Sequence, residues 1–358
     1  MIIPISQDIN KFFVNINGTN YPVKKMLFNG QGVQNVEVYA DYYSQYFTIE
    51  SLEDGNEVTF DRSQTYYAST DGGLNWTSYS TTNSWTLNTG NKIMFKATQT
   101  QSDNKCGYFS STKQFNVYGN IMSMFYGDDF EGKTTLGARL CTSMFSGCTG
   151  LVNAEHLMLP ATILGSYEAM FSGCTALTKA PQLPATTLVD GCYTNMFNGC
   201  TSLVNAPVLP ATTLANYCYN GMFKGCTSLV TAPELPATTL AFGCYVYMFE
   251  GCTSLVNAPV LPATILASNC YSNMFLRCTS LVDAPELPAL STTSGCYQFM
   301  FNGCSALRKV VCLATTVNTY DTNYWITSTS GTFYKNPAMS SWPRSIHGIP
   351  SGWTVVDW

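Results

Sequence analysis

Residues 192–214 read CYTNMFNGCTSLVNAPVLPATTL, and nearly the same stretch returns 26 residues later and again after that. A Met-Phe pair recurs every 26 residues. The same period is shared by a Gly-Cys pair, a Leu, a Tyr and an LPAT segment. The methionines of that pair are Met144, Met170, Met196, Met222, Met248, Met274 and Met300. A fixed period in this size range predicts a solenoid, in which each repeat forms one coil that stacks on the next.

Each repeat divides into two limbs. The segment LVNAPVLP carries β-forming residues and ends at a proline, so it predicts a strand of a parallel sheet with Leu203 and Leu209 facing inward. The return limb, LANYCYNGMFKGC, places Cys218, Met222, Phe223 and Cys226 at offsets 0, 4, 5 and 8. This spacing predicts a short helical turn with one buried stripe.

The rest of the chain predicts three further parts. Residues 1–40 carry Asn17-Gly18 and Asn29-Gly30 between β-forming stretches, which is typical of β-hairpins. Residues 41–118 show turn signals every 8 to 12 positions and predict a β-sandwich-like domain. The repeats would then occupy residues 119–316 and a C-terminal cap residues 317–358.

Both ends of the array look degenerate, as capping requires. Met124 and Phe125 stand only 20 residues before the first regular Met-Phe pair, which predicts an atypical first coil. At the other end, Trp325, Trp342, Trp353 and Trp358 are expected to seal the hydrophobic core.

The repeat resembles the BspA-like leucine-rich repeats. That family's coil carries Ala-Phe-x-Gly-Cys-x-x-Leu and a Leu-Pro-x-Ser/Thr turn, and here residues 222–229 read MFKGCTSL and residues 235–238 read LPAT. The coil is about three residues longer than the common one, with Met for Ala and Ala-Pro inside the strand. The resemblance covers roughly residues 120–335.

The fold class expected from this resemblance is a leucine-rich-repeat solenoid. It would have 26-residue coils, a parallel sheet and short helical turns on the return limb, preceded by an all-β domain. The resemblance implies a binding or adhesion role, typical of surface proteins of host-associated bacteria. It implies no catalytic activity and transfers no site residues.

Charge and hydropathy exclude several classes of partner. Charged residues make up 11 % of the chain and the net charge is −5, which does not favour nucleic acid. No apolar segment is long enough to insert in a membrane. The first residues, MIIPISQDINKFF, lack the pattern of a signal peptide. A surface-exposed or extracellular location is nevertheless expected, on a bacterial cell or, as an alternative, on a virion.

The cysteines are expected to fill the core. Cys192 and Cys200 are eight residues apart within one coil, and the chain has only two histidines, so the spacing does not suit zinc. No cysteine is set apart as a catalytic thiol. Disulfides between coils stay open as an alternative, although stacked coils would point equivalent Cβ atoms the same way. No metal, cofactor or catalytic residue is therefore predicted.

Three other motifs have a structural interpretation and a functional one. The tyrosine column predicts a stacked ladder with hydroxyls at the surface, or a row that binds sugar rings or peptide. STDGGLNW at residues 69–76 resembles the Asp-box, in which Asp71 caps a turn, Gly73 permits its φ and Trp76 packs behind. GDDFEG at residues 127–132 predicts a solvated capping turn, with calcium binding as the alternative.

Recognition is therefore expected at positions that vary between coils. The predicted contact residues are Asn205, Glu234, Asn257, Asp283 and Glu286 on the strand side and Tyr217, Phe242, Tyr247 and Phe299 on the return limb. The predicted function is non-enzymatic binding of a protein or glycan on a cell surface. A phage tail or fibre protein is the alternative, because the paired Asn-Gly hairpins resemble such proteins, and it would predict a homo-oligomer. A glycan-active enzyme would need a carboxylate pair, for which the sequence offers no candidate.

Overall fold

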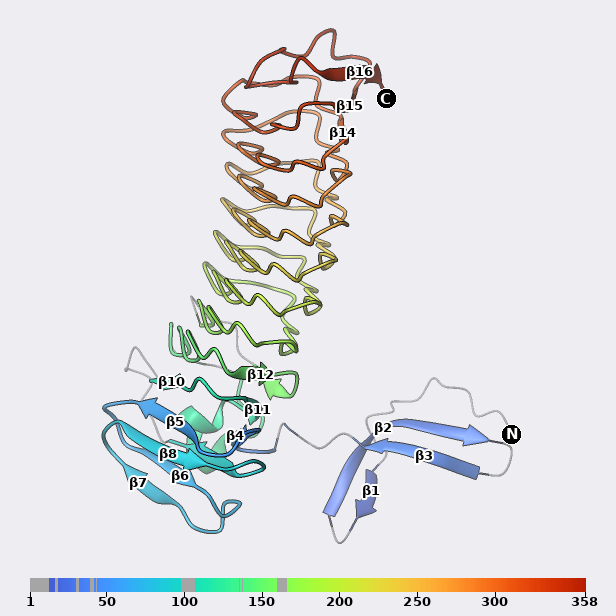
Figure 1. Cartoon of the computed structure of the whole chain (residues 1–358). Coiled ribbons are helices and arrows are strands. Elements are labelled where there is room, and N and C mark those ends of the chain that lie inside the picture. The colour runs from blue at the N-terminus through green and yellow to red at the C-terminus, as the bar shows by residue number, and fades with distance from the viewer. Residues whose placement is uncertain are drawn as a thin grey trace.

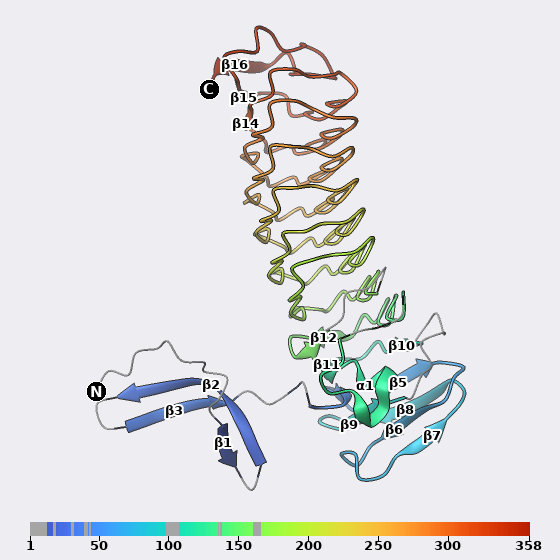
Figure 2. The same ribbon diagram turned by 180° about the vertical axis from the view of Figure 1, so that it is seen from behind.

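The structure is a rod of stacked coils that rises from a β-rich base (Figure 1). This computed structural model describes residues 42, 44–97, 107–134, 136, 138–159 and 166–358 with their side chains, together with three N-terminal strands. The view from behind shows the C-terminus at the end of the rod far from the base (Figure 2).

The three N-terminal strands form an antiparallel sheet in the order β1-β2-β3. Their bounds are β1 (Phe13–Ile16), β2 (Thr19–Asn29) and β3 (Gly32–Val38). Ile16 pairs with Thr19, and the predicted Asn17-Gly18 turn lies outside the described residues. Asn29 pairs with Gly32 and so belongs to the strand; Gly30 also lies outside the described residues.

Two sheets form the base and enclose an aromatic core. One has the order β10-β5-β8, and the other runs β12-β11-β4-β9-β6-β7, with β13 beside β11. The strands are β4 (Phe47–Ser51), β5 (Asn56–Asp61), β6 (Tyr66–Ser69), β7 (Thr77–Tyr79), β8 (Asn83–Leu87), β9 (Lys92–Lys96), β10 (Tyr108–Ser110), β11 (Phe115–Asn120), β12 (Leu151–Asn153) and β13 (Leu157–Met158). The predicted N-terminal β region is confirmed, whereas the limits of the four predicted parts remain predictions.

The base and the first coils share one sheet and one core. Strand β11 pairs antiparallel with β4 and parallel with β12, which is the first strand of the rod. The Phe60 ring stacks on Phe109 at 4.2 Å, and Phe109 stacks on Phe145 at 5.4 Å. Phe109 thus occupies the place in the phenylalanine column that Met124 and Phe125 were expected to supply. Those two residues lie instead in the short helix α1 (Ser123–Tyr126), which is followed by the 3₁₀ turn η2 (Gly127–Asp129).

The strand side of the coils is a series of parallel bridges between residues 26 positions apart. Asn205 pairs with Thr231, and Thr231 pairs with Asn257, without forming longer strands. A proline interrupts each of these coils, and proline cannot donate to a sheet ladder. Val311 stands 26 residues after Pro285 and so occupies the position that proline holds in the preceding coils. In that coil a continuous sheet forms. Its three parallel strands are β14 (Lys309–Cys312), β15 (Gly331–Lys335) and β16 (Trp353–Asp357).

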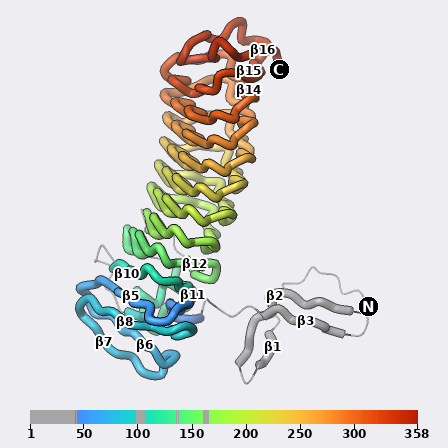
Figure 3. The backbone as a smooth tube through the Cα atoms, in the orientation of Figure 1, coloured from blue at the N-terminus to red at the C-terminus, as the bar shows by residue number. Residues whose placement is uncertain are grey.

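The helical turn predicted for the return limb is wrong. In the coil that contains Met222, Tyr217, Gly221 and Gly225 have φ values of 55°, 60° and 71°, whereas an α-helix needs negative φ at every residue. The chain instead forms successive tight turns, drawn as the corrugated edge of each coil in Figure 3. With a left-handed backbone conformation at every fourth residue, these turns bury the side chains at offsets 0, 4, 5 and 8, the same ones that a helix would bury.

Backbone hydrogen bonds alternate along this limb. The N–H groups of Asn195, Phe197 and Gly199 donate to carbonyl oxygens of the next coil at 2.8, 2.9 and 2.7 Å. Those of Asn198 and Cys200 donate three residues back at 3.1 and 3.0 Å. Every second amide therefore ties one coil to the next, and the amides between them shape the coil itself.

Tryptophans close the C-terminal end of the core. Trp325 is fully buried and stacks on Tyr297 at 6.1 Å and on Trp342 at 5.6 Å. Trp353 is also buried, and its ring nitrogen donates to the Ser328 carbonyl oxygen. Trp358 is 53 % exposed, so the expectation that it seals the core is wrong.

Replacing Arg277 with glycine is expected to stabilise the fold. Arg277 has a φ of 61° in a column that is otherwise glycine, and a left-handed conformation costs an ordinary residue roughly 1–2 kcal/mol. Because glycine also gains freedom in the unfolded chain, the expected net gain for Arg277→Gly is about 1 kcal/mol, measured by denaturant unfolding. Arg277→Ala removes the same side chain without relieving φ and serves as the control. Equal stability of the two variants would contradict the explanation.

Candidate binding surface

The cysteines belong to the interior. The fourteen cysteines among the described residues are all buried and free, while Cys106 lies outside that part. Burial raises the pKa of Cys192 and Cys304 to about 12 and that of Cys226 well above its ordinary value. Within the described residues no cluster of His, Cys, Asp or Glu could hold a metal ion. The interpretation as buried, unreactive thiols agrees with this arrangement.

The second cysteine of each coil has a specific structural role. Cys226 donates its thiol hydrogen to the Phe197 carbonyl oxygen of the preceding coil at 3.1 Å, and Cys252 does the same to Phe223. The same contact recurs from Cys148 to Cys304. A small apolar side chain with one weak donor fits this position, because it fills the core and also bonds across coils.

The tyrosine ladder also lies inside the rod. Tyr219, Tyr245 and Tyr271 are at most 2 % exposed, and successive rings are nearly parallel with centroids 5.7–5.8 Å apart. The hydroxyl oxygens of Tyr193 and Tyr297 are buried without a hydrogen-bond partner among the described residues. The expected surface hydroxyls are therefore wrong for these two, and the buried rings cannot present a sugar-binding row.

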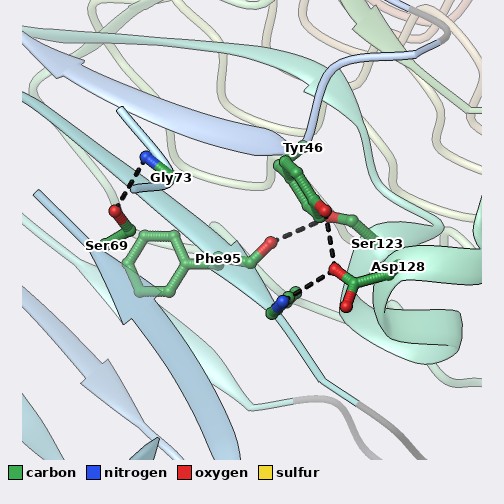
Figure 4. A network of polar contacts seen from close by, with 7 residues as sticks. Tyr46, Ser69, Gly73, Phe95, Ser123 and Asp128 are labelled. Carbon is green, nitrogen blue, oxygen red and sulfur yellow. Dashed lines mark hydrogen bonds and ion pairs between the residues drawn. The ribbon is translucent and has the colours of Figure 1, made fainter. Parts of the chain in front are cut away.

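The Asp-box motif folds as the sequence predicts. The Asp71 carboxylate accepts hydrogen bonds from the Ser69 hydroxyl at 2.7 Å and from the Asn75 amide at 3.0 Å. Gly73, with a φ of 89°, donates its N–H to the Ser69 oxygen (Figure 4). Trp76 packs behind the turn, with the Lys96 ammonium 4.4 Å from its ring centroid. The motif is a turn held by hydrogen bonds among its own residues.

The acidic segment GDDFEG forms an ion pair with the base. Asp128 accepts from the Tyr46 hydroxyl at 2.6 Å and contacts the Lys96 ammonium at 2.7 Å (Figure 4). The ammonium of Lys96 is the main cause of the lowered pKa of Asp128. Nearby, the Ser123 hydroxyl donates to the Phe95 carbonyl oxygen and fixes α1 against β9. This geometry supports the capping interpretation.

The strand-side residues predicted to contact a ligand all lie on the surface. Asn205, Glu234, Asn257, Asp283 and Glu286 are exposed. The bridges and the 26-residue period place Asn205 and Asn257 in one column that begins at Asn153 and also includes Lys179 and Lys309. Whether these residues bind a ligand stays a prediction.

A column of exposed valines at positions 204, 230, 256 and 282 is the feature that the sequence reasoning missed, whereas the outward position of Val208 and Val260 was expected. Val204 and Val256 are each 45 % exposed, and Val208 and Val260 reach 78 % and 79 %. The valine column comprises Val204, Val230, Val256 and Val282. The repeated SLV triplet carried this signal, because a β-branched apolar residue follows the inward Leu at the next position, which should face outward.

The predicted aromatic contacts are only partly exposed. Tyr217 is 41 % exposed and meets the Phe242 ring edge-on at 5.2 Å. The Lys224 ammonium lies 5.2 Å from the Tyr247 ring centroid and forms an ion pair with Glu250 at 2.8 Å. Phe299 is half-buried and stacks on Tyr324 at 5.7 Å, so it is the least accessible of the four.

The native thiols are expected to resist modification. Burial raises the pKa of the thirteen cysteines from Cys148 to Cys312, to about 12 for Cys192 and Cys304, so these thiols hold almost no thiolate at pH 8, and the thiolate is the reactive form. Ellman's reagent should therefore modify them only as fast as the protein unfolds. In guanidinium without reductant, mass spectrometry after alkylation should show all fifteen cysteines of the unfolded chain modified. Several blocked thiols would indicate the disulfides of the alternative.

The Asp71 carboxyl is expected to titrate at an unusually low pH. The Asn75 amide and the Ser69 hydroxyl lower its pKa to about 2, below the unfolded value of about 3.9. The stabilisation of the turn is therefore complete above pH 4 and is lost as pH falls toward 2. NMR titration should show this midpoint, and Asp71→Asn should remove the pH dependence of the protection of the Gly73 amide relative to its intrinsic exchange rate. A midpoint near 4 would contradict the bonding described.

Comparison with known proteins gives one family. A model of the BspA type leucine-rich repeat region matches residues 137–255 and 218–334 in six copies, which together span more than half of the chain. No curated protein and no solved structure gave a significant match. None of the helices in the described part is long and apolar enough to span a membrane. The chain belongs to the family of BspA-type leucine-rich repeat proteins.

Proposed function

We propose that this chain is a non-enzymatic recognition protein that binds a protein partner at a bacterial or host cell surface. The observation that supports the proposal is the regular row of four exposed valines along the rod, in the same limb as Val208 and Val260, which are 78 % and 79 % exposed. Exposed apolar patches of this kind are typical of interaction sites.

The rod is well suited to hold such a row in place. Every coil is tied to the next through its backbone and its stacked rings, so equivalent side chains repeat at the coil spacing of about 5 Å. A surface that is already ordered loses little conformational entropy when a partner docks. Specificity would then come from the positions that differ between coils.

The neighbouring side chains suggest the chemistry of the partner. Val208 and Val260 alternate along their column with Glu234 and Glu286, and Asp283 lies close by in sequence. Apolar contacts interspersed with carboxylates favour a protein surface with an apolar ridge and basic residues beside it. Tyr217 and Phe242 would extend the contact onto the return limb, since aromatic side chains anchor interfaces.

Removing the valine column should weaken the proposed binding. The variant carries four substitutions, Val204→Ser, Val230→Ser, Val256→Ser and Val282→Ser. It loses apolar area that the partner would bury, and burial contributes about 25 cal/mol of free energy per Å² of apolar area. The fluorescently labelled full chain is expected to bind saturably to cultured epithelial cells or to washed cells of the producing bacterium. The variant should bind at least about tenfold more weakly.

The matched control changes the same number of exposed or half-buried side chains in another column. It carries Thr201→Ser, Thr227→Ser, Thr253→Ser and Thr279→Ser, keeps the hydroxyls and should bind like the unmodified chain. Circular dichroism of both variants checks that the rod is folded. Equal binding by the valine variant, or a chain that added protease cannot reach on intact producing cells, would contradict the proposal.

A further inference from the structure

A pocket of about 490 Å³ lies where the sheet of the base meets the first coil. Its floor is the outward face of β9, β4, β11 and β12, and its rim includes Tyr42, Gln45 and His156. Pockets that bind small molecules have volumes of roughly 300–1,000 Å³. None of the residues predicted from sequence as contacts lies here.

One polar side chain from each of four neighbouring strands forms a row across the floor. Asn153 pairs with Asn116, Asn116 pairs with Glu50, and Glu50 pairs with Lys92. The row therefore combines amide donors, amide acceptors and one pair of opposite charges. Four chain segments that are far apart in sequence bring these groups together.

The side-chain amide oxygen of Asn116, in the middle of this row, has no hydrogen-bond partner among the described residues. This Oδ1 atom is buried. Leaving a buried acceptor unpaired costs about 1–3 kcal/mol, so such atoms call for an explanation. The Asn153 Oδ1 atom, by contrast, already accepts from the Glu155 amide at 2.8 Å, which leaves its NH₂ group as a donor.

The two charges on the pocket floor pair with each other. The Lys92 ammonium lies 3.6 Å from a Glu50 carboxylate oxygen and 5.6 Å from the Tyr118 ring centroid. Glu155 adds a negative charge close to Tyr42. The pocket therefore holds no unpaired cation that would attract an anionic ligand.

Aromatic rings form the apolar part of the wall. The His156 ring stacks on Tyr42 with centroids 4.4 Å apart and 8° between planes. Tyr42 meets Tyr118 edge-on at 5.9 Å. Rings beside amide donors and acceptors suit a compact ligand that has apolar C–H faces and several hydroxyl groups.

We propose that this junction pocket binds a neutral sugar unit, with a sugar hydroxyl donating to the Asn116 carbonyl oxygen. The site is distinct from the valine column, so it adds a second binding surface to the proposed recognition function. A sugar hydroxyl supplies the missing donor, and a neutral ring meets no charge penalty from the Glu50–Lys92 pair.

The test measures binding of named sugars to the full chain by saturation-transfer NMR and calorimetry. The neutral probes are methyl β-D-glucopyranoside, methyl α-D-mannopyranoside, methyl β-D-galactopyranoside and N-acetylglucosamine, and N-acetylneuraminic acid is the anionic probe. At least one neutral probe should bind with a Kd of about 1 mM or tighter, and the anionic probe more weakly. Failure of all neutral probes, or tighter binding of the anion, would overturn the proposal.

Variants then place the sugar in the pocket. Asn116→Leu should weaken binding at least about tenfold without lowering the thermal midpoint, because it removes a buried unpaired acceptor. Gln45→Trp, outside the strands, should block the pocket without altering the sheet and covers the case in which Asn116→Leu does not fold. Thr231→Leu, in the same outward column three coils beyond Asn153, is the control and should bind normally. Unchanged binding in both pocket variants would overturn the inference and leave the valine-column proposal standing.

Discussion

Stacking of each coil on the next is the constraint on which this structure depends. The ring of Phe223 lies between Phe197 and Phe249 at 5.6 and 5.8 Å, and no coil can bury its own apolar stripe alone. The amide bonds between coils and the thiol of each second cysteine hold the same spacing. A side chain in these columns must fit against a copy of itself, which explains why the interior repeats so strictly.

The same constraint governs the two ends of the rod. An uncovered coil would expose rings, so the N-terminal face is met by Phe109 and Phe60 of the base and the C-terminal face by Trp325 and Trp342. The base is thus a continuation of the rod's core as well as of its sheet. The solution at each end is non-repetitive, because a cap has to match a coil on one side only.

A strictly repeated interior leaves the exterior free to vary. The valine column tolerates exposure because the free energy that holds the coil comes from Phe, Met, Tyr, Cys and Leu inside. The junction pocket has a different origin. It is built where strands of the base continue into the coils, and there the unpaired, buried Asn116 Oδ1 atom lies in a row of polar side chains on the pocket floor. Column and pocket therefore follow from separate features of one scaffold.

The sequence by itself determined the solenoid, the buried stripe of Met222, Phe223 and Cys226, and the Asp71 turn, because each is a local pattern and the stripe repeats in register with its neighbours. It misjudged the return limb, since turns with a left-handed residue at every fourth position bury the same offsets as a helix. Only the tertiary structure decided that Phe109 begins the ring column and that Asn116, Glu50 and Lys92 share one pocket floor. Those contacts join segments of different period and distant position, and nothing in the local sequence encodes which strand becomes the neighbour of another.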